Sequence, residues 1–223
     1  MKTWPTLELE KTGFVFPNLK LNATEGVALN RVDFNSYVCG ITPYDATHLG
    51  HARTYLNFDL IHRYQILSGK NLHFTENITD VDDPLLVRAS EKNIDWKDLA
   101  QNQTELFVRD MTALRILPPS TFLSVSETID LVVDGITKLK DLGLVYEVEG
   151  DHYFDISNDL SKLPIPIDEA LKIFGERGGD PDRVGKRNKL DPLLWRAKID
   201  GEPFWPSPFG EGRPGWHIEC GVI

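Results

Sequence analysis

The chain has 223 residues, of which 41% are hydrophobic, and it carries a formal net charge of −10 at pH 7. This length and composition are typical of a soluble globular protein with one sizeable core. No stretch reaches the roughly 18 apolar residues of a membrane helix, and residues 1–5 lack the apolar region of a signal peptide. We therefore expect a cytoplasmic protein without membrane segments. The excess of acidic residues argues against a broad nucleic-acid-binding surface, because such surfaces are basic.

The first half of the sequence alternates between strand and helix patterns. Residues 34–41, 72–78 and 121–125 are short runs rich in apolar and β-branched side chains, and they predict three strands. Apolar residues recur at helical spacing from His48 until Ser68-Gly69, which predicts a helix between the first two strands. Further helix starts are marked by capping residues, namely Asp82 or Asp83, Asp95, and Ser126 with Glu127.

The second half contains a hairpin pattern at residues 144–155 with its turn at Gly150-Asp151, a short helix at 168–174, and a loop at 176–192. These patterns together predict an α/β fold with a Rossmann-like parallel sheet and an inserted module. We expect residues 1–143 to form the N-terminal part of a nucleotide-binding domain. Residues 144–208 would then form the inserted module, and residues 209–223 would return to the first domain.

The most informative segment joins a strand end to a helix start. Cys39 and Gly40 end the first strand, and a Pro/Asp turn leads to His48-Leu-Gly-His51. Such a junction suits a nucleotide, because N–H groups at a helix N-terminus point at phosphate. His48 and His51 can add hydrogen-bond donors, and Cys39 adds a thiolate that can bind a metal.

These residues resemble known motifs. His48-Leu-Gly-His51 resembles the HIGH signature of class I aminoacyl-tRNA synthetases, and Tyr37-Val-Cys-Gly40 resembles their cysteine-specific branch. Residues 77–83, residues 195–196 and residues 212–220 agree with that branch, the cysteinyl-tRNA synthetases. Other stretches are more similar to their relatives, the mycothiol-biosynthesis cysteine ligases. These stretches are Trp4-Pro5, residues 41–47, residues 82–85, residues 176–183, residues 190–195 and residues 205–209. The resemblance implies a class I synthetase (HUP) type of fold from Trp4 to Cys220.

The resemblance also implies a reaction. L-Cysteine would be activated by ATP, with Mg²⁺, to cysteinyl-adenylate and then transferred to the amine of glucosaminyl-inositol. His48 and His51 would contact the phosphates as catalytic residues. The residues that would line the adenylate are Cys39, Gly40, Ile41, Thr42, Thr54, Asn77, Ile78, Thr79 and Trp216. Thr54 could instead bond to its own helical turn, and Trp216 could belong to the core.

One zinc ion per monomer is expected, because zinc binds thiolate strongly and hydroxyl weakly and so separates cysteine from serine. Cys39 and Cys220 are the predicted ligands, and the resemblance implies that the remaining ligands lie beyond Ile223. His217 has a suitable spacing to Cys220, but the family pattern gives it no zinc role. Asp80, Asp82 and Asp83 resemble a metal cluster, although Asp82 and Asp83 fit a helix cap better.

Two other functions stay open. A cysteinyl-tRNA synthetase would transfer cysteine to tRNA, and Arg53 fits that pattern better than the ligase pattern. The acidic charge, Asp45-Ala-Thr47 and residues 176–183 favour the amino sugar. The basic residues at 183–189 are flanked by Asp180, Asp182 and Asp191. The other motifs of both families, including their Lys-Met-Ser-Lys-Ser loop, have no match here, so we expect a fragment or a natural truncation. An inactive paralogue that binds nucleotide or a partner is the remaining alternative.

Overall fold

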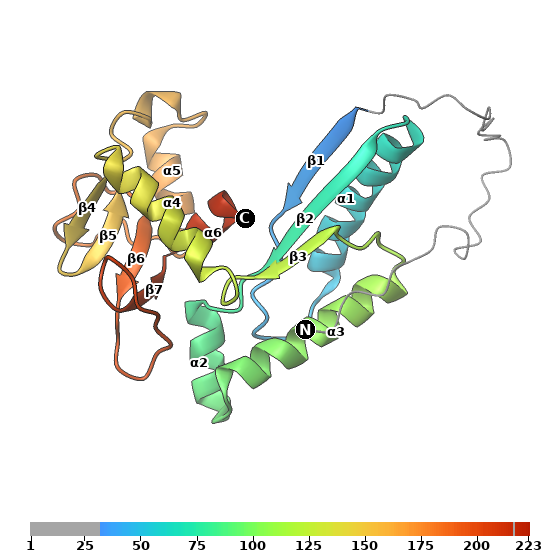
Figure 1. The fold of residues 1–223 in the computed structure, drawn as a ribbon, viewed down its shortest axis with the longest axis horizontal. Coiled ribbons are helices and arrows are strands. Elements are labelled where there is room, and N and C mark those ends of the chain that lie inside the picture. The colour runs from blue at the N-terminus through green and yellow to red at the C-terminus, as the bar shows by residue number, and fades with distance from the viewer. Residues whose placement is uncertain (1–31, 216) are drawn as a thin grey trace, which may run out of the picture. The chain divides into compact units, whose positions relative to one another are not determined.

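The computed structural model describes residues 32–215 and 217–223 (Figure 1). The chain divides into two compact units. Unit 1 holds the described residues up to Ile78 together with Arg88–Phe122, and unit 2 holds Thr79–Val87 and Leu123–Ile223. Among the described residues, no helix is long and apolar enough to cross a membrane. Trp4, Pro5 and Trp216, which contributed to the sequence interpretation, lie outside the described residues.

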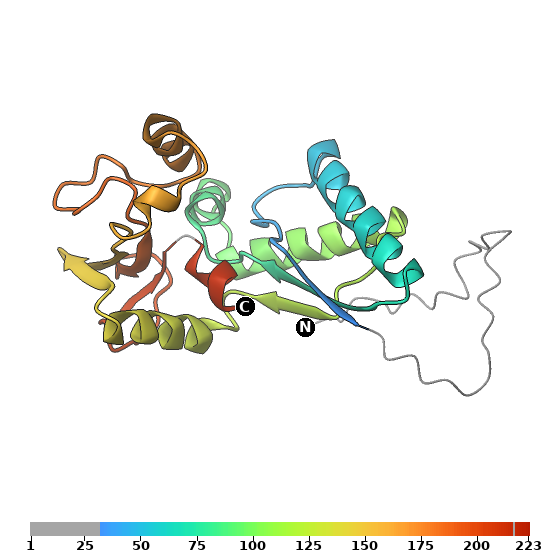
Figure 2. The same cartoon turned by 90° about the horizontal axis from the view of Figure 1, so that it is seen from above.

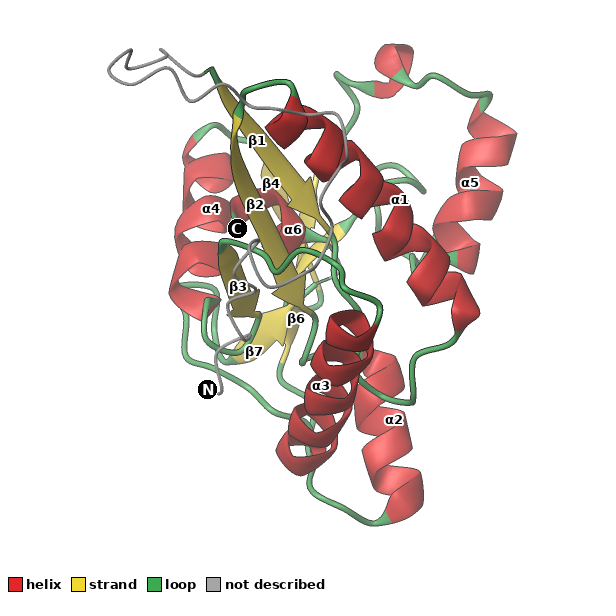
Figure 3. Cartoon of the chain, turned by 90° about the vertical axis from the view of Figure 1, so that its right-hand side faces the viewer, coloured by secondary structure: helices red, strands yellow, loops and turns green. Residues whose placement is uncertain are grey.

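Unit 1 is built around a parallel sheet. Strand β1 (Asp33–Val38) pairs in parallel with β2 (Asn71–Ile78), from Asp33 opposite Asn71 to Val38 opposite Glu76. Both arrows point the same way in Figure 3. Helix α1 (Leu49–Leu67) connects the two strands and packs against β2, and β3 (Thr121–Ser124) lies on the other side of β2. This order confirms the predicted Rossmann-like parallel arrangement.

The core of unit 1 lies between this sheet and two helices. Helix α3 (Trp96–Ala113) begins after Asp95, whose side chain accepts from the Lys97 N–H at 2.8 Å, as the sequence predicted. The buried side chains come from β1, β2, α1 and α3, and they include Val38, Tyr55, Phe74, Ile78, Phe107 and Met111. Helix α2 (Asp83–Lys92) begins in unit 2 and ends in unit 1.

Unit 2 contains an antiparallel sheet in the order β4-β5-β6-β7. Its strands are β4 (Val145–Val148), β5 (Asp151–Phe154), β6 (Leu193–Ala197) and β7 (Gly212–Pro214). Its helices are α4 (Ile129–Asp141), α5 (Ile167–Glu176) and α6 (Ile218–Val222), with a short 3-10 turn at Leu160–Lys162. Helices α4 and α6 lie side by side in both views (Figures 1 and 2).

A second core belongs to unit 2 alone. Its buried side chains come from the residue after β3, from helix α4 and from strand β6, and they are Val125, Ile129, Val132, Ile136, Leu194 and Trp195. The predicted boundaries at residues 143/144 and 208/209 stay a prediction.

Three predicted boundaries were displaced. The first strand ends at Val38 rather than residue 41, because the Gly40 N–H bonds to the Asn77 side chain instead of a strand backbone. Helix α4 begins at Ile129 rather than near Ser126, because Ser126 donates through both its N–H and its hydroxyl to Asp80. The hairpin turns at Glu149-Gly150, both with positive φ, and Asp151 already pairs with Val148.

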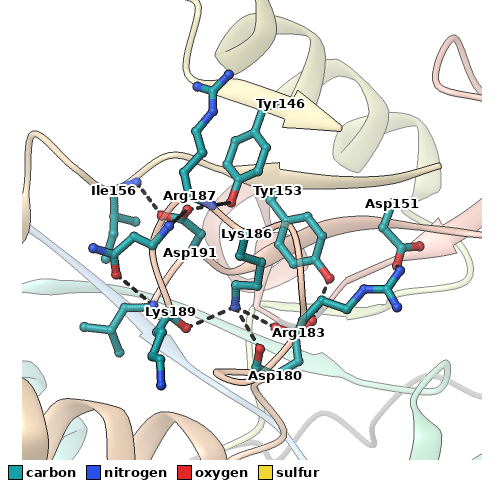
Figure 4. Close-up of polar contacts among 12 residues, drawn as sticks. Tyr146, Asp151, Tyr153, Ile156, Asp180, Arg183, Lys186, Arg187, Lys189 and Asp191 are labelled. Atoms are coloured by element: carbon teal, nitrogen blue, oxygen red, sulfur yellow. Dashed lines mark hydrogen bonds and ion pairs between the residues drawn. The ribbon is translucent and has the colours of Figure 1, made fainter. Parts of the chain in front are cut away.

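The loop at 176–192 is held by its own buried charges (Figure 4). The Lys186 side chain is only 2% exposed, and its ammonium group donates to the Asp180 carboxylate at 2.7 Å and to the Lys189 carbonyl at 3.1 Å. Asp191 is fully buried and accepts from the Tyr146 hydroxyl at 2.5 Å. Burial, and then this hydrogen bond to Asp191, raise the pKa of Tyr146 well above its usual value. The loop is therefore a fixed part of unit 2 without being a helix or a strand.

Candidate active site

Two histidines form the start of helix α1. His48 is the N-cap residue, and its Nδ1 accepts from the Gly50 N–H at 3.0 Å. The His51 Nδ1 accepts from the His48 N–H at 3.3 Å, which completes a capping box, and the two rings lie 4.1 Å apart. Since both Nδ1 atoms act as acceptors, the hydrogen-bond pattern assigns the proton of each neutral imidazole to Nε2. Both rings thereby keep an Nε2–H donor for a ligand at the helix N-terminus.

The protonation of His51 follows from its surroundings. Burial, and then the charge of the neighbouring His48, hold the pKa of His51 below its usual value. His51 is therefore neutral at pH 7, as its acceptor role in the capping box requires.

Asn77 joins the ends of β1 and β2. Its side chain is fully buried, and its Oδ1 accepts from the Tyr37 hydroxyl at 2.8 Å and from the Gly40 N–H at 3.0 Å. A Cβ on Gly40 would lie 1.5 Å from the Asn77 carbonyl oxygen, so only glycine fits there. Asn77 and Gly40 thus fix the backbone that carries Cys39.

The other predicted adenylate-lining residues occupy different environments. Ile41 and Ile78 are buried in the core of unit 1, so their side chains pack rather than face solvent. Thr54 is exposed and its hydroxyl donates to the Gly50 carbonyl at 3.2 Å, which is the alternative that the sequence left open. Thr42 is partly buried in unit 1, and Thr79 is buried in unit 2. Their roles toward a ligand stay predictions.

A buried carboxyl group supports the backbone of Cys39. Glu76 is 1% exposed, and its Oε1 has no hydrogen-bond partner among the described residues. Burial raises the pKa of Glu76 to about 8, and a hydrogen bond with Tyr55 opposes this only in part. The Tyr55 hydroxyl also donates to the Cys39 carbonyl at 3.4 Å. A protonated Glu76 can donate to Tyr55 while Tyr55 donates to Cys39, so the neutral form satisfies this chain of contacts.

The stability of unit 1 should therefore decrease with rising pH. The folded state holds a proton on Glu76 up to about pH 8, whereas the unfolded chain releases it near its model value of 4.5. The stabilisation is complete below pH 4.5 and is lost as pH rises through 8, on the order of 5 kcal/mol in total. We expect Glu76→Gln to remove this slope of the unfolding free energy against pH, as measured by urea unfolding between pH 5 and 8.5. The exposed Glu91→Gln is the control, and a slope that persists in Glu76→Gln would contradict the assignment.

Unit 2 contributes a histidine and a cysteine at the start of α6. The Cys220 Sγ lies 3.6 Å from the His217 Nδ1, and His217 has a φ of 72°. Both cysteines of the chain are thiols rather than disulfide partners. The intervening Glu219 is 2% exposed, and burial, followed by the nearby Cys220, raises its pKa to about 8. His217 and Cys220 belong to a Cys/His group that could hold a metal ion. Because Cys39 belongs to unit 1, its proximity to Cys220 stays a prediction.

The three aspartates after β2 have separate partners. Asp82 precedes α2 and its Oδ1 accepts from the Asp83 N–H at 2.8 Å, as expected for a residue at a helix start. Asp80 accepts from the Ser126 hydroxyl at 2.5 Å, although burial still raises its pKa. In the described part of the chain these three residues do not form a candidate metal group.

Sequence reasoning missed a charge cluster around Asp83. Its carboxylate accepts from Arg196 at 2.9 and 3.0 Å and also from Arg213, which is buried. Arg213 in turn donates to Glu202 at 2.8 Å. These pairs connect the start of α2 to β6 and β7. The only sequence signal was two arginines within otherwise recognisable motifs, which did not identify their partner.

Comparisons with known proteins agree on one family. Residues 26–223 match the family model described as "tRNA synthetases class I (C) catalytic domain". A relative from Corynebacterium jeikeium, named L-cysteine:1D-myo-inositol 2-amino-2-deoxy-alpha-D-glucopyranoside ligase 2, is 47% identical over 235 residues, covering 100% of this chain and 57% of the relative. A ligase of the corresponding name from Streptosporangium roseum is 56% identical over 190 residues, covering 84% of this chain and 47% of the relative. The chain thus spans about half the length of these curated relatives.

A solved structure has a fold similar to that of this chain. The structure titled Mycobacterium tuberculosis methionyl-tRNA synthetase in complex with methionyl-adenylate superposes with a TM-score of 0.59. The match covers 83% of this chain and 45% of that chain, at 16% sequence identity. This likeness establishes a shared fold and nothing more about substrates.

Proposed function

Since the chain belongs to the family of class I (C) tRNA synthetase catalytic domains, we propose that it serves the ATP-dependent ligation of L-cysteine to the amine of glucosaminyl-inositol. The observation that carries this proposal is the 46–56% identity to proteins named as that ligase, which in several cases covers the whole chain. Because the chain spans about half the length of these relatives, we propose the complete ligation for a protein that contains this chain.

In the proposed first step, a carboxylate oxygen of cysteine attacks the α-phosphorus of ATP, and pyrophosphate leaves. In the second step, the sugar amine attacks the carbonyl carbon of cysteinyl-adenylate, and AMP leaves. No protein nucleophile is needed, so positioning and charge stabilisation provide the rate. Mg²⁺ would accompany ATP.

The start of α1 is the proposed phosphate site. The Nε2–H groups of His48 and His51 would donate to phosphate oxygens, and the helix N-terminus adds its positive dipole end. Neutral imidazoles suit this role, because they donate a hydrogen bond while their Nδ1 atoms keep the helix capped. Gly40, held by Asn77, is one of the residues proposed to line the adenylate at the strand end.

A bound metal ion would distinguish cysteine from serine as the substrate. Zinc, when bound, would hold the substrate thiolate and reject the hydroxyl of serine. Cys39 and Cys220 are the proposed thiolate ligands. The 3.6 Å separation between Cys220 and His217 supports a donor site at the start of α6.

The charge distribution favours the amino sugar over tRNA as acceptor. The basic residues at 183–189 are each paired with a carboxylate in unit 2. Lys186 pairs with Asp180 (Figure 4), Arg183 with Glu149, Arg187 with Asp155 and Lys189 with Asp182. Cations that are neutralised in this way contribute little to binding a phosphate backbone.

The proposal predicts which acceptor is consumed. Protein should be tested both as residues 1–223 and in the longest form that its gene encodes. With ATP and labelled cysteine, the active form should modify glucosaminyl-inositol and release AMP, and it should leave tRNA uncharged. Transfer of label to tRNA alone would contradict the proposal in favour of a cysteinyl-tRNA synthetase. Absence of cysteine-dependent pyrophosphate exchange in both forms would favour the inactive paralogue.

A further inference from the structure

The residue just before helix α1 is tied to a neighbouring helix of unit 1 by a side-chain hydrogen bond. We propose that Thr47 and Asp110 are positioning residues for the phosphate site, and that they act by holding the peptide that carries the His48 N–H. The catalytic part of this inference rests on the proposed function, whereas the geometry of the histidine pair can be tested without substrates.

The contact joins segments that are far apart in the sequence. The Thr47 hydroxyl donates to the Asp110 Oδ2 at 3.0 Å, across 63 positions. Asp110 belongs to α3 and follows the buried Phe107 by three residues. Residues three apart share one face of a helix, and on this face the Phe107 ring packs against the Tyr55 ring of α1 with 5.1 Å between centroids. The packing of the two helices therefore sets the position of the acceptor.

The peptide between Thr47 and His48 couples this contact to the histidine pair. His48 is the N-cap residue, with an extended backbone (φ −125°, ψ 175°), and its N–H donates to the His51 Nδ1 at 3.3 Å. A peptide unit is planar, so a displacement of Thr47 also moves this N–H. The bond to Asp110 thus keeps the Nδ1 of His51 engaged as an acceptor, and it keeps the proton of the neutral ring on Nε2.

A second tether holds the same segment. The Asp45 Oδ2 accepts from the Arg88 guanidinium at 3.0 Å, and its Oδ1 accepts from the Ala46 N–H at 2.9 Å. Arg88 belongs to the part of α2 that lies in unit 1. The Asp45 side chain is 52% exposed, so this ion pair alone contributes little. The segment 45–47 is nevertheless bonded to other helices at both of its ends, immediately before the phosphate site.

A purely structural contact would change stability alone, and a set of substitutions separates the two roles. Thr47→Val keeps the shape of the side chain and removes the donor, whereas Thr47→Ser keeps the donor. Asp110→Ala removes the acceptor, and the Thr47→Val/Asp110→Ala double variant should match the single variants if both residues act through one bond. The control is Thr112→Val on the same helix, where the lost hydroxyl donates to the Val108 carbonyl of its own turn at 2.7 Å.

The first measurement is the tautomer of the two histidine rings in the purified 223-residue chain, read from proton–nitrogen NMR spectra that are assigned with His48→Ala and His51→Ala. Both wild-type rings should carry their proton on Nε2. Thr47→Val and Asp110→Ala should shift His51 to a mixture of tautomers, whereas Thr47→Ser and Thr112→Val should keep the wild-type spectrum. A wild-type His51 protonated on Nδ1, or a folded Thr47→Val chain with the wild-type His51 tautomer, would overturn the proposal.

The second measurement is cysteine-dependent pyrophosphate exchange by the longest form that the gene encodes. The kcat/KM for ATP should fall by about 10–100-fold in Thr47→Val, because lost hydrogen bonds to charged groups and small displacements of binding groups carry losses of this size. Thermal unfolding checks that the variant is folded. An unchanged kcat/KM beside an active wild type would overturn the proposal. Absence of exchange in the wild type would count against the proposed function instead, and the tautomer measurement would still decide the role of Thr47.

Discussion

Replacing Gly40 by alanine is expected to lower the free energy of unfolding of unit 1 by about 3–4 kcal/mol. The new Cβ would lie 1.5 Å from the backbone carbonyl oxygen of Asn77, so the segment after β1 must move away from β2. Overpacking of this kind costs about 1–3 kcal/mol or more, and the hydrogen bond from the Gly40 N–H to Asn77 would be lost as well. Cys39 would move with this segment, so metal binding should weaken together with stability.

Hydrogen exchange read by mass spectrometry can assign this loss to unit 1. Protection should fall in β1 and β2 while the β4–β7 sheet of unit 2 keeps its protection. Gly221→Ala is the matched control, because a Cβ there meets no atom within 4 Å and alanine favours the helix. Unchanged exchange in β1 and β2 of the Gly40→Ala protein would contradict the close approach to Asn77.

Replacing Asp191 by alanine is expected to destabilise unit 2 by more than about 3 kcal/mol. The fully buried carboxylate accepts from the Tyr146 hydroxyl at 2.5 Å, the Asn188 N–H at 2.8 Å and the Ile156 N–H at 3.0 Å (Figure 4). Each donor left unpaired in a buried site costs about 1–3 kcal/mol. The loop at 176–192 and the β4–β5 hairpin should lose protection together, because Asp191 joins them.

Two further substitutions serve as controls for the Asp191→Ala prediction. Asp182→Ala, in the same loop, removes a carboxylate that is 92% exposed and should change stability by less than about 0.5 kcal/mol. Tyr146→Phe removes one of the three donors and should cost less than Asp191→Ala. Equal stability of the Asp191→Ala and Asp182→Ala proteins, measured by urea unfolding, would show that this network does not hold the loop.

The regular elements of unit 1 could be predicted because their signals are local. Apolar periodicity located α1 to within one residue at each end, and the capping aspartate located the start of α3. The use of His48 as a cap was not predicted, because histidine is not among the usual capping residues and its role depends on His51 one turn later.

Contacts between distant residues could not be predicted in the same way. Asp83 and Arg213 are 130 positions apart, and nothing in either motif specifies the partner. The Asn77 Oδ1 is used by Tyr37 and Gly40, an arrangement that depends on the register of β1 against β2, and the place of Asn77 beside a nucleotide stays a prediction. Local pattern determines which residues gather at the sheet edge, but tertiary packing determines which of their atoms stay available to a ligand.

His51 makes the start of α1 sensitive to acid. A serine or glutamate cap keeps its acceptors at any pH between 5 and 8, whereas an imidazole loses its acceptor on gaining a proton. Because the pKa of His51 is lowered in the fold, the unfolded chain takes up that proton first. This contribution to stability is complete above the model value of 6.5 and is lost as pH falls from there through the lower folded pKa. Acidification would thus loosen the first turn of the helix at the end that faces the proposed phosphate site, while the hydrophobic packing of α1 against β2 stays unchanged.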